Sequence, residues 1–590
     1  MQAATVQAAT QAGSKRPDVR LSRRPEGGAG APLPAHPADL LGHLYRARGA
    51  TAGPALALTG MHPVATLKGI DLASDLLARQ VQAGGHILVV GDYDADGATG
   101  SALAVLGLRA LGAARVSSLI PSRFAFGYGL SPAVVEAALP LGPDLILTVD
   151  NGIASVAGVA RAAQAGIPVV VTDHHLAGAE LPLAAAIINP NQPGCAFPSK
   201  HLAGVGVMFY LLAALRARLR ELGWFAAGRR EPNLAAFLDL VALGTVADVV
   251  TLDENNRILV EQGLQRIRAG RCCPGVRALI SVAGRDPDRA TARDLGFAAG
   301  PRLNAAGRLT EMSLGVECLL TDDPDLAMDL ARQLDGLNRE RRGIEGGMRE
   351  EAEAMVEALR LDRAGLPAGL CLSGEGWHQG VTGIVAARIR ERYQRPTIAF
   401  GDAGDGRLRG SGRSVEAANI RDLIDAVDKA HPGLIERFGG HAMAAGLTLP
   451  AAHLDDFATA FAAAAHAELG DRPPVRELVS DGELAPACLN LETAEALRTA
   501  GPWGKGFPEP LFDGVFEVLD RRLVGDGHLR LRLRPGLAGV TQSIEAIGFG
   551  LGEAMGEAQG QVHLAYRLDV NDYRGLRAPQ LLLEYLKAAS

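Results

Sequence analysis

The sequence has few aromatic residues and lacks any long apolar run. Phe, Trp and Tyr make up 4 % of the 590 residues, whereas apolar residues make up 48 % and charged residues 21 %. The last two fractions are ordinary for a globular protein that buries sizeable cores. No apolar run approaches the ~20 residues of a membrane-spanning helix, so we expect no membrane contact. The length predicts several domains, at roughly 100–200 residues each.

Paired cysteines and a strong positive charge are also absent. None of the six cysteines belongs to a CxxC pair or has the spacing of a zinc site, which predicts reduced thiols and a cytoplasmic location. The net charge of −7 argues against a protein that coats nucleic acid by charge alone. It does not exclude a nuclease, because bound divalent cations and a local basic groove can supply a positive field.

Composition and apolar periodicity divide the chain into five expected parts. A stretch rich in Ala, Gly, Pro and Arg predicts a disordered tail. Repeated strand–helix–strand patterns predict a doubly wound α/β domain, then a helical connector weakened at Gly346 and Gly347, then a second α/β unit. Short strands and turns at the end predict a small β-barrel. In chain order, these parts span residues 1–38, 39–320, 321–362, 363–472 and 473–590.

Three apolar runs in the first α/β domain predict buried parallel strands, and each is followed by acidic or imidazole side chains. The runs and the side chains after them are His86–Val90 with Asp92, Asp94 and Asp96, Asp144–Val149 with Asp150, and Ile167–Val171 with Asp173, His174 and His175. A fourth apolar segment, Phe237–Leu243, leads to Asp248. Because loops at the carboxyl ends of parallel strands form the ligand crevice of an open sheet, we expect these side chains to gather there.

This set of side chains predicts a site for divalent cations. Crowded carboxylates repel one another and raise one another's pKa values, a cost that bound cations remove. Carboxylate and imidazole ligands without thiolates suit Mn²⁺ or Mg²⁺ better than zinc. Two ions about 3.5–4 Å apart can activate water and hold a scissile phosphate. We expect Asp94 and Asp96 to reach neighbouring ions and Asp150 to bridge them.

Each motif alone has a simpler interpretation. Asp-x-Asp-Gly and Asp-Asn-Gly are most often surface turns, and a His-His pair can be satisfied by hydrogen bonds beside a core. Their occurrence at three successive predicted strand ends favours the metal site.

Several motifs resemble those of the DHH phosphoesterases, and in particular the members that degrade single-stranded DNA from its 5′ end. The four that surround the expected metal site are Gly91–Gly97, Val149–Gly152, Asp173–His175 and Gly244–Asp248. The others are Pro301–Arg308, Gly376–Gly380, Gly412–Ser414, Phe438–His441 and Gly501–Pro508. The resemblance implies two α/β lobes, DHH and DHHA1-like, joined by a long helical segment, and a C-terminal OB-fold β-barrel.

The resemblance also implies a role for each residue of the site. The implied metal ligands are Asp94, Asp96, Asp150, His174 and Asp248. The implied catalytic residues are His175, which would contact the scissile phosphate, Asp150, and Asp92, which would lie in or beside the cluster. Many relatives have a histidine where this chain has Val90. The first ion would therefore have one protein ligand fewer, which Asp92 or water would replace.

The same motifs supply candidates for substrate binding. Arg302, Ser411 and Arg413 are expected in loops of small residues, where the backbone can approach a phosphate, and Arg123 resembles another phosphate-contacting residue. The full set of substrate-binding candidates is Arg123, Arg302, Asn304, His378, Ser411, Arg413 and His441. A single arginine is more often part of a surface ion pair. His378 and His441 either line the cleft or hydrogen-bond loop backbone.

In the expected barrel, Leu529–Arg534 alternates strictly between Leu and Arg. Such alternation places the leucines on one face of a strand and the arginines on the other. The basic face is either simply solvated or follows the backbone of a single strand, as OB-folds commonly do.

Together these features predict an exonuclease specific for single-stranded DNA. The resemblance implies that it hydrolyses phosphodiesters 5′→3′ with two Mn²⁺ or Mg²⁺ ions, releases 5′-mononucleotides, and acts as a monomer in DNA repair and recombination. A helicase and a single-strand binding protein are the expected partners. The alternative is an oligoribonuclease or cyclic-dinucleotide phosphodiesterase of the same superfamily, but those chains are typically shorter and lack the barrel. A binding protein with an inactive site is disfavoured by the intact ligand set.

Overall fold

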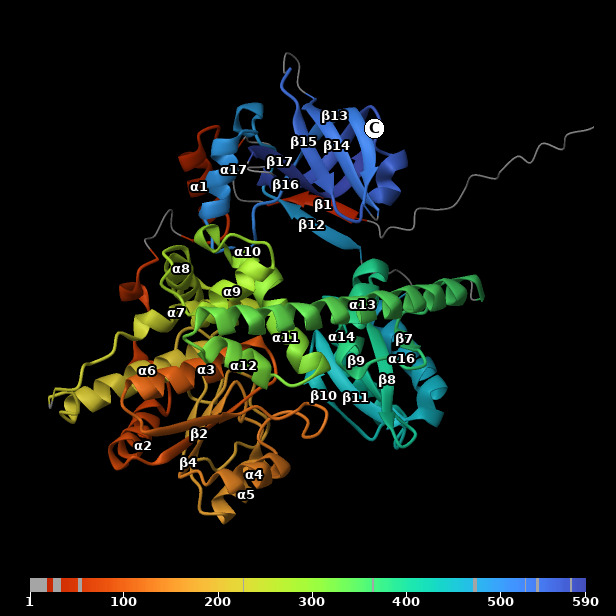
Figure 1. The fold of residues 1–590 in the computed structure, drawn as a ribbon. Coiled ribbons are helices and arrows are strands. Elements are labelled where there is room, and N and C mark those ends of the chain that lie inside the picture. Colours follow the sequence, from red (N-terminus) through yellow and green to blue (C-terminus); the bar gives the residue numbers. More distant parts are fainter. Residues whose placement is uncertain are drawn as a thin grey trace, which may run out of the picture. The chain divides into compact units, whose positions relative to one another are not determined.

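The computed structural model describes residues 19–24, 33–50, 56–226, 228–362, 365–470, 475–525, 527–536, 541–573 and 576–589. The chain divides into two compact units, whose helices and strands are labelled in Figure 1. The large unit comprises Arg23–Arg339 and Ser480–Ser590, and the small unit comprises Met1–Ser22 and Glu340–Val479.

A parallel five-stranded sheet forms the centre of the first α/β domain, within the large unit. In the order in which they pair, its strands are β3 (Arg115–Leu119), β2 (His86–Gly91), β4 (Leu145–Val149), β5 (Val169–Thr172) and β6 (Ala186–Ile188). The three predicted strands are confirmed, and they are paired in register along the middle of the sheet. Their near-continuous Val, Ile and Leu content suits strands covered on both faces.

The two faces of this sheet pack into separate cores, because successive side chains of a strand alternate between them. Ile87 and Val89 belong to the larger core, whereas Leu88 and Val90 belong to the smaller one. The larger core includes α2 (Ile70–Ala83), α3 (Ala95–Ala110), α6 (Gly204–Glu221), α7 (Leu238–Ala247), α8 (Glu254–Arg268) and α9 (Pro274–Val282). The smaller core includes α4 (Pro132–Ala138) and α5 (Val156–Gln164). The doubly wound prediction is thereby confirmed.

Helices also form the rest of this domain. The fourth apolar segment, which leads to Asp248, is helix α7 and not a strand. The remaining helices of the domain are α10 (Ala292–Asp294), α11 (Gly300–Leu309) and α12 (Ser313–Leu320).

Part of the expected disordered tail is ordered. Strand β1 (Val19–Arg23) pairs with β12 (Arg476–Ser480), and α1 (Pro37–Arg46) begins before residue 39. The prediction for residues 1–38 was therefore wrong at these positions. The composition of the tail does not indicate that β1 pairs with a strand more than 450 residues away in the sequence. Residues 1–18 and 25–32 of the tail lie outside the described part of the chain.

Helix α13 (Pro324–Asp362) forms the predicted connector. Its 39 residues run through Gly346 and Gly347 without interruption.

The small unit contains the second α/β fold. Its sheet has the strand order β10 (Arg437–His441), β11 (Ala444–Pro450), β9 (Arg407–Arg413), β8 (Thr397–Gly404) and β7 (Leu370–Ser373). Its helices are α14 (Gln379–Tyr393), α15 (Ile420–Ala430) and α16 (Leu454–Leu469).

A closed five-stranded barrel follows in the large unit, as predicted. Its strands are β13 (Phe512–Val524), β14 (His528–Pro535), β15 (Ile544–Gly548), β17 (Leu576–Ala588) and β16 (Gln561–Tyr573), and α17 (Leu491–Thr499) precedes them in the chain. Among the described residues, no helix is both long and apolar enough to cross a membrane.

Candidate metal centre

The turn between β2 and α3 carries the first three carboxylates. Asp94 is the N-cap of α3, where its Oδ1 accepts hydrogen bonds from the main-chain N–H groups of Asp96 (2.9 Å) and Gly97 (3.0 Å). The N–H of Ala95 donates to Oδ1 of Asn304 at 2.8 Å. Asn304 therefore positions the turn. The sequence predicted substrate binding by Asn304 and not this contact.

Asp96 lies in the first turn of α3, and its carboxylate contacts the start of a second helix, α6. Its Oδ2 accepts from the N–H of Gly204 at 2.6 Å and its Oδ1 accepts from the N–H of Val205 at 2.9 Å. These N–H groups begin α6, and a helix N-terminus stabilises negative charge. The carboxylate is almost fully buried, so these bonds offset part of the cost of its burial.

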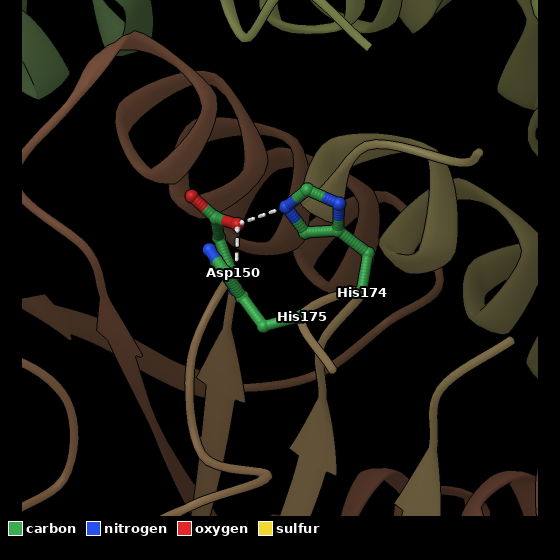
Figure 2. Close-up of side chains that lie close together, drawn as sticks. All are labelled: Asp150, His174 and His175. Atoms are coloured by element: carbon green, nitrogen blue, oxygen red, sulfur yellow. Dashed lines mark ion pairs between the residues drawn. The ribbon is translucent and has the colours of Figure 1, made fainter. Parts of the chain in front are cut away.

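Asp150 and His174 face each other at the carboxyl ends of β4 and β5 (Figure 2). His174 Nε2 lies 3.0 Å from Asp150 Oδ1, 3.6 Å from Asp248 Oδ2 and 3.9 Å from Asp96 Oδ2. Both Nε2 of His174 and Oδ1 of Asp150 are buried without a well-formed hydrogen bond among the described residues. Two unsatisfied ligand atoms that face a cluster of carboxylates are the arrangement expected around a cation.

The ligand atoms fall into three overlapping groups, within each of which all atoms lie within 4.8 Å of one another. The groups are Asp150 with His174 and His175, Asp96 with His174 and Asp248, and Asp92 with Asp94 and Asp150. The structure therefore brings together all the predicted metal ligands and both of the additional catalytic candidates.

The pKa values of these groups reflect their crowding. Burial and the neighbouring charges of Asp96 and Asp94 raise the pKa of Asp150 well above its usual value. Burial and the charge of Asp94 raise the pKa of Asp96 to about 7. Burial and the charge of His175 lower the pKa of His174 to about 4, so its imidazole is neutral, as a metal ligand must be. Divalent cations would remove the repulsion among the carboxylates.

His175 is held differently from His174. Its Nδ1 lies 2.8 Å from Asp173 Oδ1, and Asp173 also accepts main-chain hydrogen bonds from His174, His175 and Ile153. Burial opposes the charged form, but the hydrogen bond from His175 to Asp173 raises the pKa of His175 to about 9. The imidazole is therefore a cation that can donate a hydrogen bond.

Asp173 was expected among the side chains around the cations, but it belongs to none of the three ligand groups. No role was predicted for Tyr128. Asp173 orients His175, and its position directly before the His-His pair was the available signal. The Tyr128 hydroxyl donates to the main-chain oxygen of Asp150 at 3.2 Å and lies 3.0 Å from Nδ1 of His175. Nothing in the local sequence of Tyr128 indicated this contact.

The Gly501–Pro508 motif forms a turn that contacts the segment after Asp248. The N–H of Leu252 donates to the main-chain oxygen of Lys505 at 2.7 Å. The rings of Phe507 and Trp503 are stacked, with their centroids 5.3 Å apart. The guanidinium of Arg257 lies 3.6 Å from the ring centroid of Phe507. Burial and neighbouring carboxylates raise the pKa of Asp248 well above its usual value, and the charge of Lys505 partly opposes this increase.

The arginine candidates of the large unit lie in different settings. The guanidinium of Arg123 lies 4.3 Å from the ring centroid of Tyr93. Tyr93 lies between Asp92 and Asp94 in the sequence. Arg302 lies on α11 and not in a loop, so that expectation was wrong. Its Nη2 is 2.7 Å from Asp335 Oδ1, and its Nη1 donates to the main-chain oxygen of Ala298.

The candidates of the small unit lie on its sheet and on α14. Ser411 and Arg413 belong to strand β9, so the loop prediction was wrong for them too. Register places His441, Ala444 and Arg413 side by side across three strands. His378 is the N-cap of α14, where its Nδ1 accepts from the N–H of Gly380 at 3.1 Å.

The alternating segment of the barrel is strand β14, with its leucines buried as predicted. Two of its arginines are neutralised, because Arg530 pairs with Glu545 at 2.9 Å and Arg534 pairs with Glu517. Arg532 is exposed. The basic face is therefore weaker than its sequence indicated.

Comparison with known proteins agrees with this arrangement. The family model "DHH family, N-terminal domain" matches residues 86–245, the DHHA1 domain matches 366–467 and the RecJ OB domain matches 480–585. The single-stranded-DNA-specific exonuclease RecJ of Dickeya dadantii is 53 % identical over 96 % of this chain and 99 % of its own length. The protein of the same name from Escherichia coli is 51 % identical over 96 % of this chain and 98 % of its own length.

A solved structure is similar as well. The crystal structure of RecJ in complex with Mn²⁺ from Thermus thermophilus aligns with a TM-score of 0.75 at 32 % identity, over 97 % of this chain and 80 % of that one. A parallel sheet with carboxylates and imidazoles at its strand ends, followed by a DHHA1 domain, defines a DHH phosphoesterase. Within that class, the chain belongs to the RecJ family.

Proposed function

We propose that this chain is an exonuclease that degrades single-stranded DNA in the 5′→3′ direction and releases 5′-mononucleotides. The observation that carries the proposal is the convergence of five carboxylates with His174 and His175 at one end of the sheet. The names of the relatives support the substrate. We propose that the enzyme acts in DNA repair and recombination.

The residues fit Mn²⁺ or Mg²⁺. The donor atoms of the proposed ligands are carboxylate oxygens and the imidazole nitrogen of His174, and none of the three groups contains a thiolate. Solved RecJ structures from Thermus thermophilus are described with Mn²⁺ and with Mg²⁺. When bound, two ions would polarise the phosphate and lower the pKa of water. The proposed ligands are Asp94, Asp96, Asp150, His174 and Asp248, with Asp150 shared between the ions.

Position Val90 bears on the first ion. Its side chain is fully buried among apolar neighbours, and its main-chain oxygen accepts from Asn151 Nδ2 at 3.1 Å. Val90 supplies no side-chain ligand, so we propose that Asp92, which is grouped with Asp94 and Asp150, takes part in holding this ion.

The cationic His175 has a separate task. We propose that it donates a hydrogen bond to a nonbridging oxygen of the scissile phosphate, where negative charge increases in the transition state. Asp173 and the Tyr128 hydroxyl both contact Nδ1 of the ring, at 2.8 Å and 3.0 Å, and thereby orient it.

Arginines and small residues would bind the strand. We propose that Ser411, Arg413 and His441 bind the 5′-terminal phosphate, and that Arg123, Arg302 and His378 also contact the strand. The exposed Arg532 of the barrel is the proposed contact for more distant nucleotides. Because such an enzyme needs an unpaired strand, a helicase and a single-strand binding protein are the proposed partners of a cytoplasmic monomer.

Digestion of end-labelled oligonucleotides tests the proposal. With Mn²⁺ or Mg²⁺, a 5′-labelled single strand should release its label at once as a mononucleotide, whereas a 3′-labelled strand should shorten progressively. A blunt duplex of the same sequence should resist. Early release of the 3′ label, or equal degradation of duplex and single strand without a helicase, would refute the proposal. Preference for di- to pentaribonucleotides would favour the oligoribonuclease alternative.

A further inference from the structure

The small unit contains a cavity that the proposed function does not use. Its volume is about 230 Å³, and it is lined by Arg409, Arg437, Phe438, Gly439, Gly446, Leu447 and Thr448. This volume is below the about 300–1,000 Å³ of pockets for drug-sized ligands. The cavity therefore suits a small group such as a phosphate better than a whole nucleoside.

Strand register places the polar lining on one face of the sheet. Arg437, Thr448 and Arg409 are direct neighbours across β10, β11 and β9. Leu447 and Phe438 point to the opposite face, where they pack in the core. The cavity therefore has the guanidinium groups of Arg409 and Arg437 on one face of the sheet.

The floor of the cavity is made of glycine. Gly439 and Gly446 form the next row across the sheet. A Cβ at Gly439 would meet no atom within 4 Å, and a Cβ at Gly446 would meet only a main-chain oxygen at 3.7 Å. A ligand can thus approach the backbone closely, as in other sites that hold phosphate.

The charges around the cavity favour an anion. Among the described residues that line it, none is acidic. Arg437 is exposed, and its Nε donates to Thr448 Oγ1 at 3.3 Å, which holds the guanidinium over the sheet. Glu436, its neighbour in sequence, lies 3.7 Å from Arg407. Two arginines on one face provide the planar donors that bind phosphate oxygens well.

The cavity continues the row of residues proposed for the 5′-terminal phosphate. On β9, Arg409 is two residues from Ser411 and four from Arg413, so all three side chains share one face. Two residues of a strand span about 7 Å, a distance that a triphosphate chain can bridge.

We propose that Arg409 and Arg437, above the floor of Gly439 and Gly446, form a second phosphate-binding site next to that of Ser411 and Arg413. The phosphate group belongs either to a 5′-triphosphate end of the strand or to a free nucleotide. The link to the strand end rests on the proposed function, whereas the anion site itself does not.

Calorimetric titration of the full-length protein with inorganic pyrophosphate tests the site. EDTA is present throughout, so that bound cations and cleavage play no part. Arg437→Gln should raise the Kd at least tenfold, and so should the double variant Gly439→Ala/Gly446→Ala, whose methyl groups fill the floor without a steric clash. Arg407→Gln is the matched control, since Arg407 lies on the same strand and face as Arg409 but does not line the cavity. Equal Kd values in all four proteins would overturn the proposal.

Binding of three further ligands in EDTA identifies the source of the phosphate. If it is the strand end, a 5′-triphosphorylated oligonucleotide should bind wild type at least fivefold more tightly than a 5′-monophosphorylated one, and Arg437→Gln should remove the difference. If it is a free nucleotide, the two oligonucleotides should bind equally and the affinity for dTMP should fall in Arg437→Gln. The proposal would be overturned if the two oligonucleotides bound equally and Arg437→Gln left the affinity for dTMP unchanged. Because no cleavage is needed, these results stand even if the digestion experiment contradicts the proposed function.

Discussion

Gly204 occupies a point where any side chain would collide with Asp150. A Cβ there would lie 2.5 Å from Cβ of Asp150 and 2.8 Å from its Oδ1. The N–H of the same glycine donates to Asp96. Asp150 itself has a φ of +63°, in the left-handed region that residues other than glycine rarely adopt. Such strain, of order 1–3 kcal/mol, is typical of residues held for function.

We therefore expect Gly204→Ala to displace Asp150 and lower nuclease activity at least tenfold, with a higher Mn²⁺ concentration needed for half-maximal rate. The matched control is Gly206→Ala on the same helix, whose Cβ would meet only the flexible side chain of Leu202, at 3.2 Å. Initial rates on a single strand across a Mn²⁺ titration measure both effects. Equal rates for the two variants would show that the close approach at Gly204 is not needed.

At the scale of the element, α13 is the feature for which sequence and structure differ most informatively. Its two adjacent glycines predicted a weak point, yet the helix continues through them. A Cβ at Gly347 would meet no atom within 4 Å, and this residue is exposed. Neither packing nor backbone conformation therefore requires glycine at this position.

Gly347→Ala should raise the free energy of unfolding by about 0.5–1 kcal/mol, because glycine in a helix interior is disfavoured by that amount relative to alanine. Urea unfolding followed by circular dichroism measures the change. Activity on a single strand should stay within twofold of wild type. A stabilised protein with much lower activity would instead indicate that bending at the glycines is part of the catalytic cycle.

At the scale of the whole molecule, residues far apart in the chain are joined by polar contacts to the buried carboxylate of Asp513. Arg23 donates to Asp513 at 2.7 Å, and Asp513 also accepts from Ser480 and contacts His563 at 3.1 Å. Burial alone would raise the pKa of Asp513, but the hydrogen bonds from His563 and Arg23 hold it well below its usual value. The ordered strand β1 thus contributes a charge to the base of the barrel.

The stabilisation from Asp513 should depend on pH. A depressed pKa in the folded state means that the contribution is present above the unfolded pKa, near 3.9, and is lost as the pH falls through the folded value. Asp513→Asn should cost roughly 1–3 kcal/mol at pH 7, and this difference from wild type should shrink below about pH 4. Urea unfolding at several pH values measures it. Asp520→Asn, an exposed change on the same strand, should cost less than about 0.5 kcal/mol at every pH.

Local patterns predicted most of this architecture. The strands and the gathering of Asp94, Asp150 and His174 followed from apolar runs, because carboxyl ends of parallel strands share one edge. The barrel followed from short alternating strands. Contacts between distant segments were not predictable in this way: the pairing of β1 with β12, the buried pair of Arg302 with Asp335, and the pairing of Arg530 with Glu545. No local pattern specifies which distant side chain will lie opposite another.

The central claim is that Asp150 binds cations required for hydrolysis. The most direct measurement is the initial rate of nucleotide release from single-stranded DNA with Mn²⁺ for wild type, Asp150→Asn and Asp144→Asn. Asp144 precedes the same strand at its opposite end and forms an exposed ion pair with Arg115, so it is the matched control. Asp150→Asn should lower the rate by more than the about 10–100-fold that loss of an outer-shell partner costs, while Asp144→Asn should stay near wild type. A folded Asp150→Asn protein with the wild-type rate would contradict the account.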